Sequence, residues 1–63
     1  MTVKTITLEG REFKCRYGSG YNEHSYTTVY DNEDGRYIGE LEDINWENSR
    51  FTQRLKELVA LNG

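Results

Sequence analysis

The chain has 63 residues with eight basic and eleven acidic side chains, a formal net charge of −3 at pH 7, and room for a single domain, residues 1–63, around one small core. One cysteine and one histidine exclude an intramolecular disulfide and a structural zinc site, and no apolar stretch approaches the roughly 20 residues that cross a bilayer. The lone cysteine fits a reducing compartment, so we expect a cytoplasmic protein without cofactor, metal or membrane association, and its eight aromatic side chains (one Trp, five Tyr, two Phe) favour a folded chain.

The first predicted element is a β-hairpin near the N-terminus. Residues 3–8 alternate threonine with aliphatic side chains, as a half-buried strand does, and Gly10 supplies the positive φ that a two-residue turn at Glu9 and Gly10 requires. This turn pairs Leu8 with Arg11. The resulting register places one largely apolar set on a single face, namely Ile6, Leu8, Phe13, Cys15 and Tyr17. The opposite face receives Val3, Thr5, Thr7, Glu12, Lys14 and Arg16.

The second predicted hairpin joins residues 25–31 to residues 36–41 through an acidic turn that ends at Gly35. The number of loop residues decides which side chains face the core. We expect an even number, because this register gives the core the larger apolar area, from Tyr26, Tyr30, Tyr37 and Leu41 beside Gly39. It leaves the opposite face with Thr27, Val29, Ile38 and Glu40. Val29 and Ile38 would then form a small exposed apolar centre.

A helix is predicted at the C-terminal end. From Asn48 or Ser49 onward the apolar period changes to 3.6, and either residue can cap a helix. The predicted apolar stripe is Phe51, Leu55, Leu58 and Val59, and Asn62 with Gly63 closes the helix. Trp46 is expected to plug the edge of the core. The predicted fold class is therefore α+β: a four-stranded antiparallel sheet of two hairpins, with one C-terminal helix packed on one face and the other face open.

Two side chains are candidates for chemistry, and neither pattern favours an enzyme. Cys15 lies in mid-strand among core positions, which predicts a buried structural thiol. His24 lies in the polar loop of residues 18–24, which predicts a solvated histidine. The turn at residues 31–35 is acidic but lacks the spacing of a calcium loop, because Gly35 comes one residue early. We expect no catalytic residues and no metal site.

Charge is distributed unevenly along the chain. Residues 31–47 contain seven of the eleven acidic residues and one basic residue, Arg36, for a net charge of −6, whereas the rest of the chain carries +3. Such a segment can steer encounter with a basic partner, although a charge run is also typical of a solvated face that keeps a protein soluble. Tyr21, a loop aromatic outside any periodic pattern, is a candidate anchor. The predicted partner-binding residues are Asp31, Glu33, Asp34, Glu40, Glu42, Asp43, Glu47 and Tyr21.

We therefore predict a small non-enzymatic protein-binding module whose acidic strip docks on a basic, nucleic-acid-binding surface of its target. Small acidic domains without proline resemble accessory inhibitors from phages and mobile elements, such as inhibitors of restriction or CRISPR nucleases.

Two alternatives remain open. The strand, acidic turn, strand and helix of residues 26–61 resemble, in topology alone, the small DNA-binding domains of phage integrases and AP2-type factors. This resemblance implies a nucleic-acid-binding regulatory domain that uses the open sheet face, although the negative net charge disfavours nucleic acid as a partner. The other alternative is a homodimer, formed through the open face or an edge strand, that reinforces the thin core.

Overall fold

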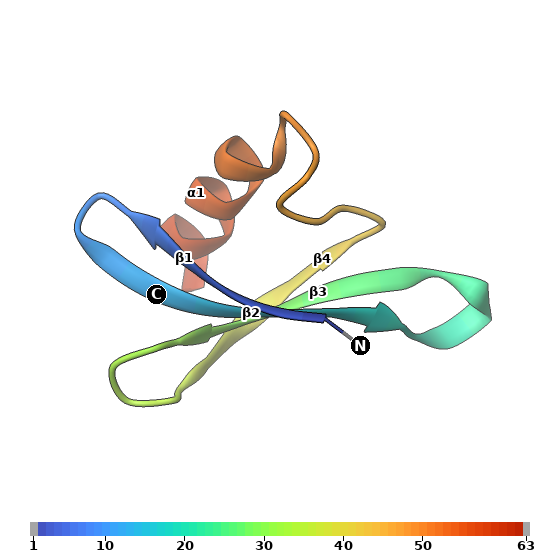
Figure 1. Cartoon of the computed structure of the whole chain (residues 1–63), viewed down its shortest axis with the longest axis horizontal. Coiled ribbons are helices and arrows are strands. Elements are labelled where there is room, and N and C mark those ends of the chain that lie inside the picture. The colour runs from blue at the N-terminus through green and yellow to red at the C-terminus, as the bar shows by residue number, and fades with distance from the viewer. Residues whose placement is uncertain (1, 63) are drawn as a thin grey trace.

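The chain forms a four-stranded antiparallel sheet and one α-helix. Figure 1 shows their arrangement in a computed structural model, which describes residues 2–62 and, for Tyr21, only the backbone. The elements in chain order are β1 (Thr2–Leu8), β2 (Arg11–Ser19), the short 3-10 turn η1 (Tyr21–Glu23), β3 (Ser25–Asp31), β4 (Tyr37–Glu42) and α1 (Phe51–Asn62). Strands that follow one another in the chain are neighbours in the sheet, in the order β1-β2-β3-β4. The predicted α+β fold is confirmed.

The first hairpin has the predicted register. Glu9 and Gly10 adopt φ angles of 51° and 83°, so both lie in the left-handed region that a tight two-residue turn requires. The pairs Leu8–Arg11, Ile6–Phe13 and Lys4–Cys15 form as expected. β2 continues to Ser19, two residues beyond the predicted strand, because its last residues still pair with β3.

The second hairpin differs from the predicted register. Tyr30 pairs with Tyr37, but Val29 pairs with Gly39, so Ile38 is an extra residue in a β-bulge of β4. The side of the sheet that faces the helix therefore receives Thr27, Val29, Ile38 and Leu41, each at most 5% exposed. The prediction that the tyrosines of this hairpin fill the core is wrong, as is the prediction of an exposed apolar centre at Val29 and Ile38.

Two packing requirements explain why these aliphatic side chains are buried and the tyrosines are not. A buried tyrosine hydroxyl needs a hydrogen-bond partner, whereas valine, isoleucine and leucine bury only apolar surface. The helix also lies close to β4, since a Cβ atom at Gly39 would stand 2.7 Å from Cδ1 of Leu58. A strand and a helix in such close contact leave space for small and aliphatic side chains rather than for phenol rings.

α1 packs its predicted apolar stripe against the sheet. The stripe consists of Phe51 and Leu55, which are buried, and of Leu58 and Val59, which pack against the same core. Asn48 accepts a hydrogen bond from the backbone N–H of Arg50 at 2.8 Å, so it forms a turn just before the first helical residue, Phe51. The predicted closing residue Gly63 lies outside the described residues.

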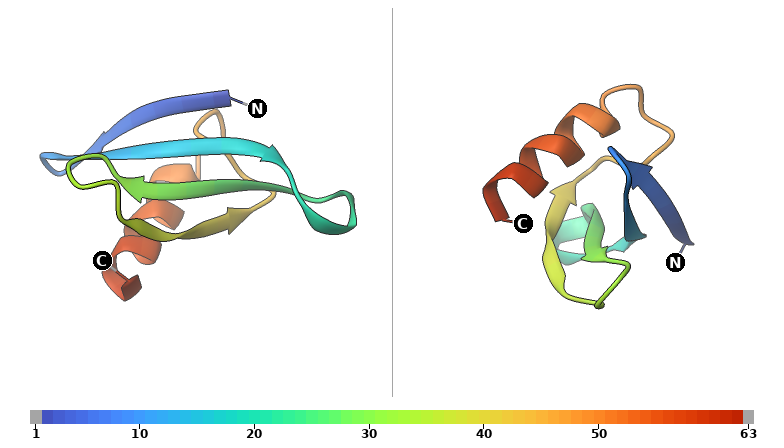
Figure 2. Two further views of the ribbon diagram at one scale, coloured as in Figure 1. Left: turned by 90° about the horizontal axis from the view of Figure 1, so that it is seen from below. Right: turned by 90° about the vertical axis from the view of Figure 1, so that its left-hand side faces the viewer.

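Figure 2 shows that α1 covers one face of the sheet and leaves the other face uncovered. Trp46 closes one edge of the core as predicted, because its ring lies 6.4 Å from the rings of both Tyr17 and Phe51 in edge-on contacts. The hydroxyl of Thr27 donates to the backbone carbonyl of Ile44 and ties the loop before the helix to β3. Over residues 2–62, no helix has the length and apolar character of a membrane span.

Candidate functional site

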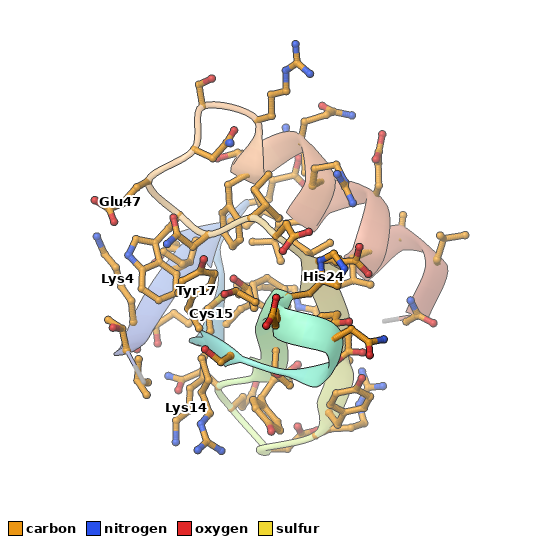
Figure 3. The ribbon with its side chains drawn as sticks, turned by 90° about the vertical axis from the view of Figure 1, so that its right-hand side faces the viewer. Lys4, Lys14, Cys15, Tyr17, His24 and Glu47 are labelled. Carbon is orange, nitrogen blue, oxygen red and sulfur yellow. The ribbon has the colours of Figure 1, made fainter. Side chains whose placement is uncertain are left out.

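The sheet face that α1 leaves uncovered, called the open face below, presents side chains from all four strands. Strand pairing aligns these side chains in rows across the sheet. The open face consists of Val3, Thr5, Thr7, Glu12, Lys14, Arg16, Tyr26, Thr28, Tyr30, Tyr37, Glu40 and Glu42. In Figure 3, Lys14 projects from the sheet on the side away from the helix.

The charged and aromatic side chains of the open face form three stripes. The basic stripe is Lys14 and Arg16 on β2, the tyrosine stripe is Tyr26 and Tyr30 on β3 with Tyr37 beside them on β4, and the acidic stripe is Glu40 and Glu42 on β4. One row across the sheet contains Arg16, Thr28 and Glu40, with Thr28 between the two charged residues. Glu12 lies apart at the other end of β2, where Asn32 donates to it at 3.4 Å. The face therefore changes from basic to acidic across three strands.

Two adjoining pockets hollow the open face along the tyrosine stripe. The first, of about 220 Å³, is lined by Arg16, Gly18, Ser19, Gly20, Tyr26, Thr28, Tyr30 and Glu40. The second, of about 350 Å³, is lined by Lys14, Arg16, Tyr30, Asp31, Asn32 and Gly35. Arg16 and Tyr30 line both pockets, so the two hollows adjoin, and together they are called the groove below.

Local contacts hold the tyrosine rings in place. Tyr30 and Tyr37 meet edge to face, with ring centroids 5.9 Å apart and an interplanar angle of 68°. The ring of Tyr26 lies against Gly20, where any Cβ atom would overlap the ring. The backbone N–H of Gly20 donates to the carbonyl of His24 at 2.7 Å and fixes this approach. Glycine at position 20 is therefore required for Tyr26 to line the groove.

The acidic stripe acts electrostatically on the tyrosine stripe. Burial raises the pKa of the Tyr26 phenol, and the carboxylates of Glu42, Glu40 and Asp43 raise that pKa further. A neighbouring negative charge disfavours the phenolate, so these three carboxylates add to the effect of burial and place a negative potential at Tyr26. A positively charged group of a partner would be attracted to this side of the open face.

The predicted acidic strip is divided in the structure, and part of it shapes the β3–β4 turn. Asp31 accepts the backbone N–H of Glu33 at 2.8 Å and a side-chain N–H of Arg11 at 2.9 Å. The backbone hydrogen bond from Glu33, followed by the Arg11 guanidinium, lowers the pKa of Asp31. Asp34 accepts the backbone N–H of Arg36 at 2.9 Å. These carboxylates stabilise the acidic turn locally.

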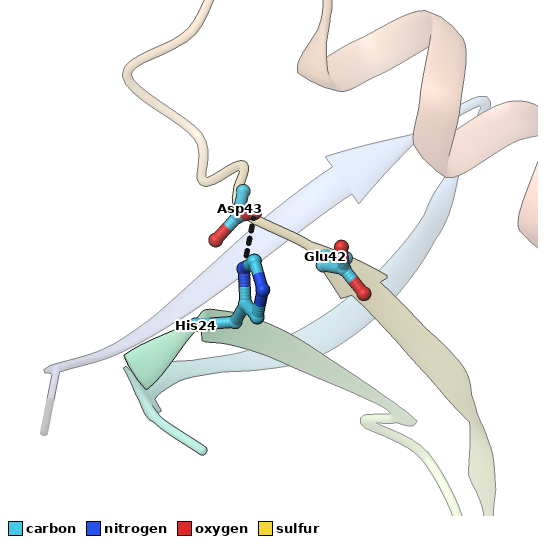
Figure 4. A group of neighbouring side chains, drawn as sticks. All are labelled: His24, Glu42 and Asp43. Carbon is cyan, nitrogen blue, oxygen red and sulfur yellow. Dashed lines mark hydrogen bonds and ion pairs between the residues drawn. The ribbon is translucent and has the colours of Figure 1, made fainter. Parts of the chain in front are cut away.

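At the other end of β4, Asp43 fastens the loop that precedes β3. Its carboxylate lies 2.9 Å from Nδ1 of His24 (Figure 4). It also accepts the backbone N–H of Ser25 at 3.2 Å. The hydrogen bond to His24 is the main cause that lowers the pKa of Asp43, and the Ser25 N–H adds to it. Glu42 is close by, and His24, Glu42 and Asp43 each have one nitrogen or oxygen atom of the kind that binds metals within 4.8 Å of the other two, at the exposed surface. The two hydrogen bonds of Asp43 connect the loop before β3 to the end of β4, and they show that Asp43 is the carboxylate that orients His24.

The remaining predicted site residues lie apart from one another. Glu33 is in the β3–β4 turn, and Glu47 is in the loop before α1, on the helix side of the sheet (Figure 3). The side chain of Tyr21 lies outside the described part of the chain. Of the seven predicted carboxylates, Glu40 and Glu42 are the two that join the tyrosines on the open face.

Cys15 and His24 occupy different environments. Cys15 is fully buried, and burial raises its pKa to about 11, so the thiol is protonated at neutral pH. His24 is exposed in the loop at the end of the sheet. The predicted buried thiol is confirmed, and the structure does not bring the two side chains together as a nucleophile and its base.

Sequence reasoning missed the tyrosines as surface residues. One signal in the sequence was available, because Gly39 interrupts a strand pattern, and a glycine inside a strand often marks a bulge or a close backbone approach. The bulge at Ile38 keeps Tyr37 opposite Tyr30 but shifts residues 39–42 by one residue relative to β3. Leu41 therefore no longer shares a face with the tyrosines: it faces the helix with Val29, and Tyr26, Tyr30 and Tyr37 lie on the open face.

Comparisons of the chain with protein-family models, with curated proteins and with solved structures find no match. The resemblances to DNA-binding domains and to accessory inhibitors therefore stay predictions. The function has to be argued from the open face itself.

Proposed function

We propose that the protein is a small non-enzymatic module of the cytoplasm that binds another protein through the open face. The observation that supports this proposal is the tyrosine stripe, which places three phenol rings on a sheet face that the helix of the same chain does not cover. Tyrosine and arginine are enriched at the energetic centres of protein interfaces. Polar side chains alone would suffice on a face that only meets water.

The charges beside the tyrosines indicate the chemistry of the partner. Glu40 and Glu42 flank the rings on β4, and their potential reaches the phenol of Tyr26. A partner with basic groups opposite β4 would meet complementary charge and associate faster. The narrower hypothesis, an accessory inhibitor of phage or mobile-element type that docks on a nucleic-acid-binding groove, rests on these two carboxylates, because the turn carboxylates and Asp43 serve the fold.

The tyrosine stripe can be tested by affinity capture. Immobilised protein and its Tyr26→Ser/Tyr30→Ser variant are incubated with lysate of the source organism, and retained proteins are quantified by mass spectrometry. We expect the variant to retain at least about tenfold less of a specific partner, since anchor residues at interface centres are worth about 2 kcal/mol or more each. Leu61→Ser, at a position on α1 that is 84% exposed, is the control and should retain the partner fully. Equal retention by the tyrosine variant would contradict the proposal.

The role of the acidic stripe is separated from that of total charge by two double variants. Glu40→Gln/Glu42→Gln neutralises the stripe, whereas Glu33→Gln/Glu47→Gln removes the same charge elsewhere. A partner that meets β4 with basic groups should be lost from the first variant and retained by the second. If both variants lose the partner equally, the binding depends on the net charge of the protein and not on the acidic stripe of the open face.

Single-stranded nucleic acid is a second candidate, because the groove combines Lys14 and Arg16 with tyrosine rings on which bases can stack. The net charge of −3 and the acidic stripe oppose this binding. A gel shift with single-stranded DNA and RNA at low salt tests it. Binding that Lys14→Glu and Arg16→Glu abolish would support the nucleic-acid candidate, and no shift would remove it.

A further inference from the structure

The open face carries charges of both signs on opposite sides of an aromatic stripe, and this arrangement makes it complementary to itself. We propose that the open face binds a second copy of this chain, related by a two-fold axis that runs parallel to β3. The inference rests on the proposed function, because it names the partner of the same face. A two-fold axis is the symmetry expected for the association of two identical surfaces.

A two-fold axis along β3 turns the face over and exchanges its two sides. The basic stripe on β2 then lies over β4 of the other copy, which carries the acidic stripe, and Tyr26 and Tyr30 of the two copies meet between them. This rotation keeps each row at the same height along the strands. Because Arg16 and Glu40 share one row, Arg16 faces Glu40 of the partner subunit, and Glu40 faces Arg16 of the partner subunit.

The charge pattern also excludes the other two-fold arrangement of the same faces. An axis perpendicular to the strands would place β2 over β2 and β4 over β4, so charges of like sign would oppose one another. Two sheets that pack face to face keep their strand directions within about 30° of each other, which is compatible with an axis parallel to β3. The stripes therefore select one orientation.

Exposed apolar surface favours burial of this face. Tyr37, a large hydrophobic side chain that remains 54% exposed, lies on β4 and would be covered by β2 of the second copy in this arrangement. Strand spacing gives the face a width of about 14 Å and a length of about 24 Å. Such a face offers less than the roughly 800 Å² per partner of a standard interface, so we expect a weak dimer with a dissociation constant of roughly 0.1 mM.

Sedimentation velocity on the full chain, from roughly 10 μM to 1 mM, measures this association directly. The wild-type protein should change from monomer to dimer, and added salt should weaken the dimer. Arg16→Glu and Glu40→Arg should each raise the dissociation constant at least about tenfold. In a dimer of either variant, residues 16 and 40 carry the same charge, so two pairs of like charges face each other. An equimolar mixture of the two variants should associate again, since every substituted position then faces an opposite charge.

Two further variants control for fold and for net charge. Arg54→Glu on the exposed side of α1 and Glu47→Arg in the loop before it make the same charge changes away from the open face, and they should leave the dimer unchanged. Far-ultraviolet circular dichroism shows whether each variant is folded. The proposal is overturned by a wild-type protein that stays monomeric at 1 mM, by a dimer that all four variants weaken equally, or by two folded variants that stay monomeric when mixed.

These outcomes are distinct from failure of the proposed function. A monomeric wild-type protein that still captures a different protein through Tyr26 and Tyr30 would remove the second copy as partner and leave the binding module standing. A protein that is monomeric and captures no partner through these tyrosines would remove both.

Discussion

Thr27 is the polar side chain that is fully buried in the described core, and it links two elements that are distant in the sequence. Its hydroxyl donates to the backbone carbonyl of Ile44, a residue that is 8% exposed. A buried carbonyl that loses its donor keeps its desolvation cost without compensation. This hydrogen bond explains why a threonine, rather than a third aliphatic residue, occupies this position beside Val29 and Leu41.

Replacing the hydroxyl of Thr27 by a methyl group tests this contact. Thr27→Val keeps the shape of the side chain but leaves the Ile44 carbonyl without its donor, so the free energy of unfolding should fall by about 1–3 kcal/mol. Thr28→Val makes the same chemical change on the open face and should alter the free energy of unfolding by less than about 0.5 kcal/mol. Urea unfolding at pH 7, followed by circular dichroism, measures both variants. Equal effects at the two positions would mean that the hydrogen bond contributes nothing specific.

At the level of elements, the two hairpins differ in how far the sequence determines their register. The two-residue turn at Glu9 and Gly10 fixes the pairing of β1 with β2 and agrees with the apolar pattern, so local information was sufficient there. The longer acidic turn leaves the register of β4 open. A bulge at Ile38 sets that register and places Gly39 close to Leu58, a residue far away in the sequence. Gly39 alone indicates a bulge or a close approach, but its neighbour on the helix is known only from the assembled core. The helical stripe was predictable because its period is local.

The contact between β4 and α1 predicts that an added methyl group at position 39 is harmful, although alanine is usually tolerated in strands better than glycine. In Gly39→Ala the Cβ atom would stand 2.7 Å from Cδ1 and 3.3 Å from Cγ of Leu58. The helix or the Leu58 rotamer must then shift, and overpacking of this kind costs about 1–3 kcal/mol of unfolding free energy.

A double-mutant cycle shows whether Leu58 is the cause. Leu58→Ala removes the atoms that the added methyl group would meet, so Gly39→Ala should cost less than about 0.5 kcal/mol in that background. Chemical denaturation of the four proteins gives the coupling free energy. An equal cost of Gly39→Ala in both backgrounds would show that the strain lies elsewhere.

At the scale of the whole molecule, the charge count along the chain predicted an asymmetry but not its arrangement. The acidic segment contains the β3–β4 turn, all of β4 and the first part of the loop before α1, and of its carboxylates only Glu40 and Glu42 reach the open face. The basic stripe comes from Lys14 and Arg16 on β2, which precede Asp31, the first residue of this segment, by 17 and 15 residues. Pairing of β2 and β4 with β3 creates the striped face, so the candidate site is a property of the sheet that no single segment encodes.

The distribution of carboxylates also determines how the fold responds to acid. The pKa values of Asp31 and Asp43 are lowered in the folded protein, chiefly by the Glu33 N–H and by His24 respectively. The unfolded chain therefore binds protons first as the pH falls, so the stability that these groups contribute is complete above about pH 5 and is lost as the pH falls through the folded pKa values.

Wild-type protein should lose stability between pH 7 and pH 3, and Asp31→Asn and Asp43→Asn should each lose less stability over that interval. Glu33→Gln removes one carboxylate from the same turn and is the matched control, because a change in net charge alone would flatten the three profiles equally. Urea midpoints measured across this pH range decide the matter: if both aspartate variants keep the full wild-type slope, the hydrogen bonds to Asp31 and Asp43 do not set the acid stability of the fold.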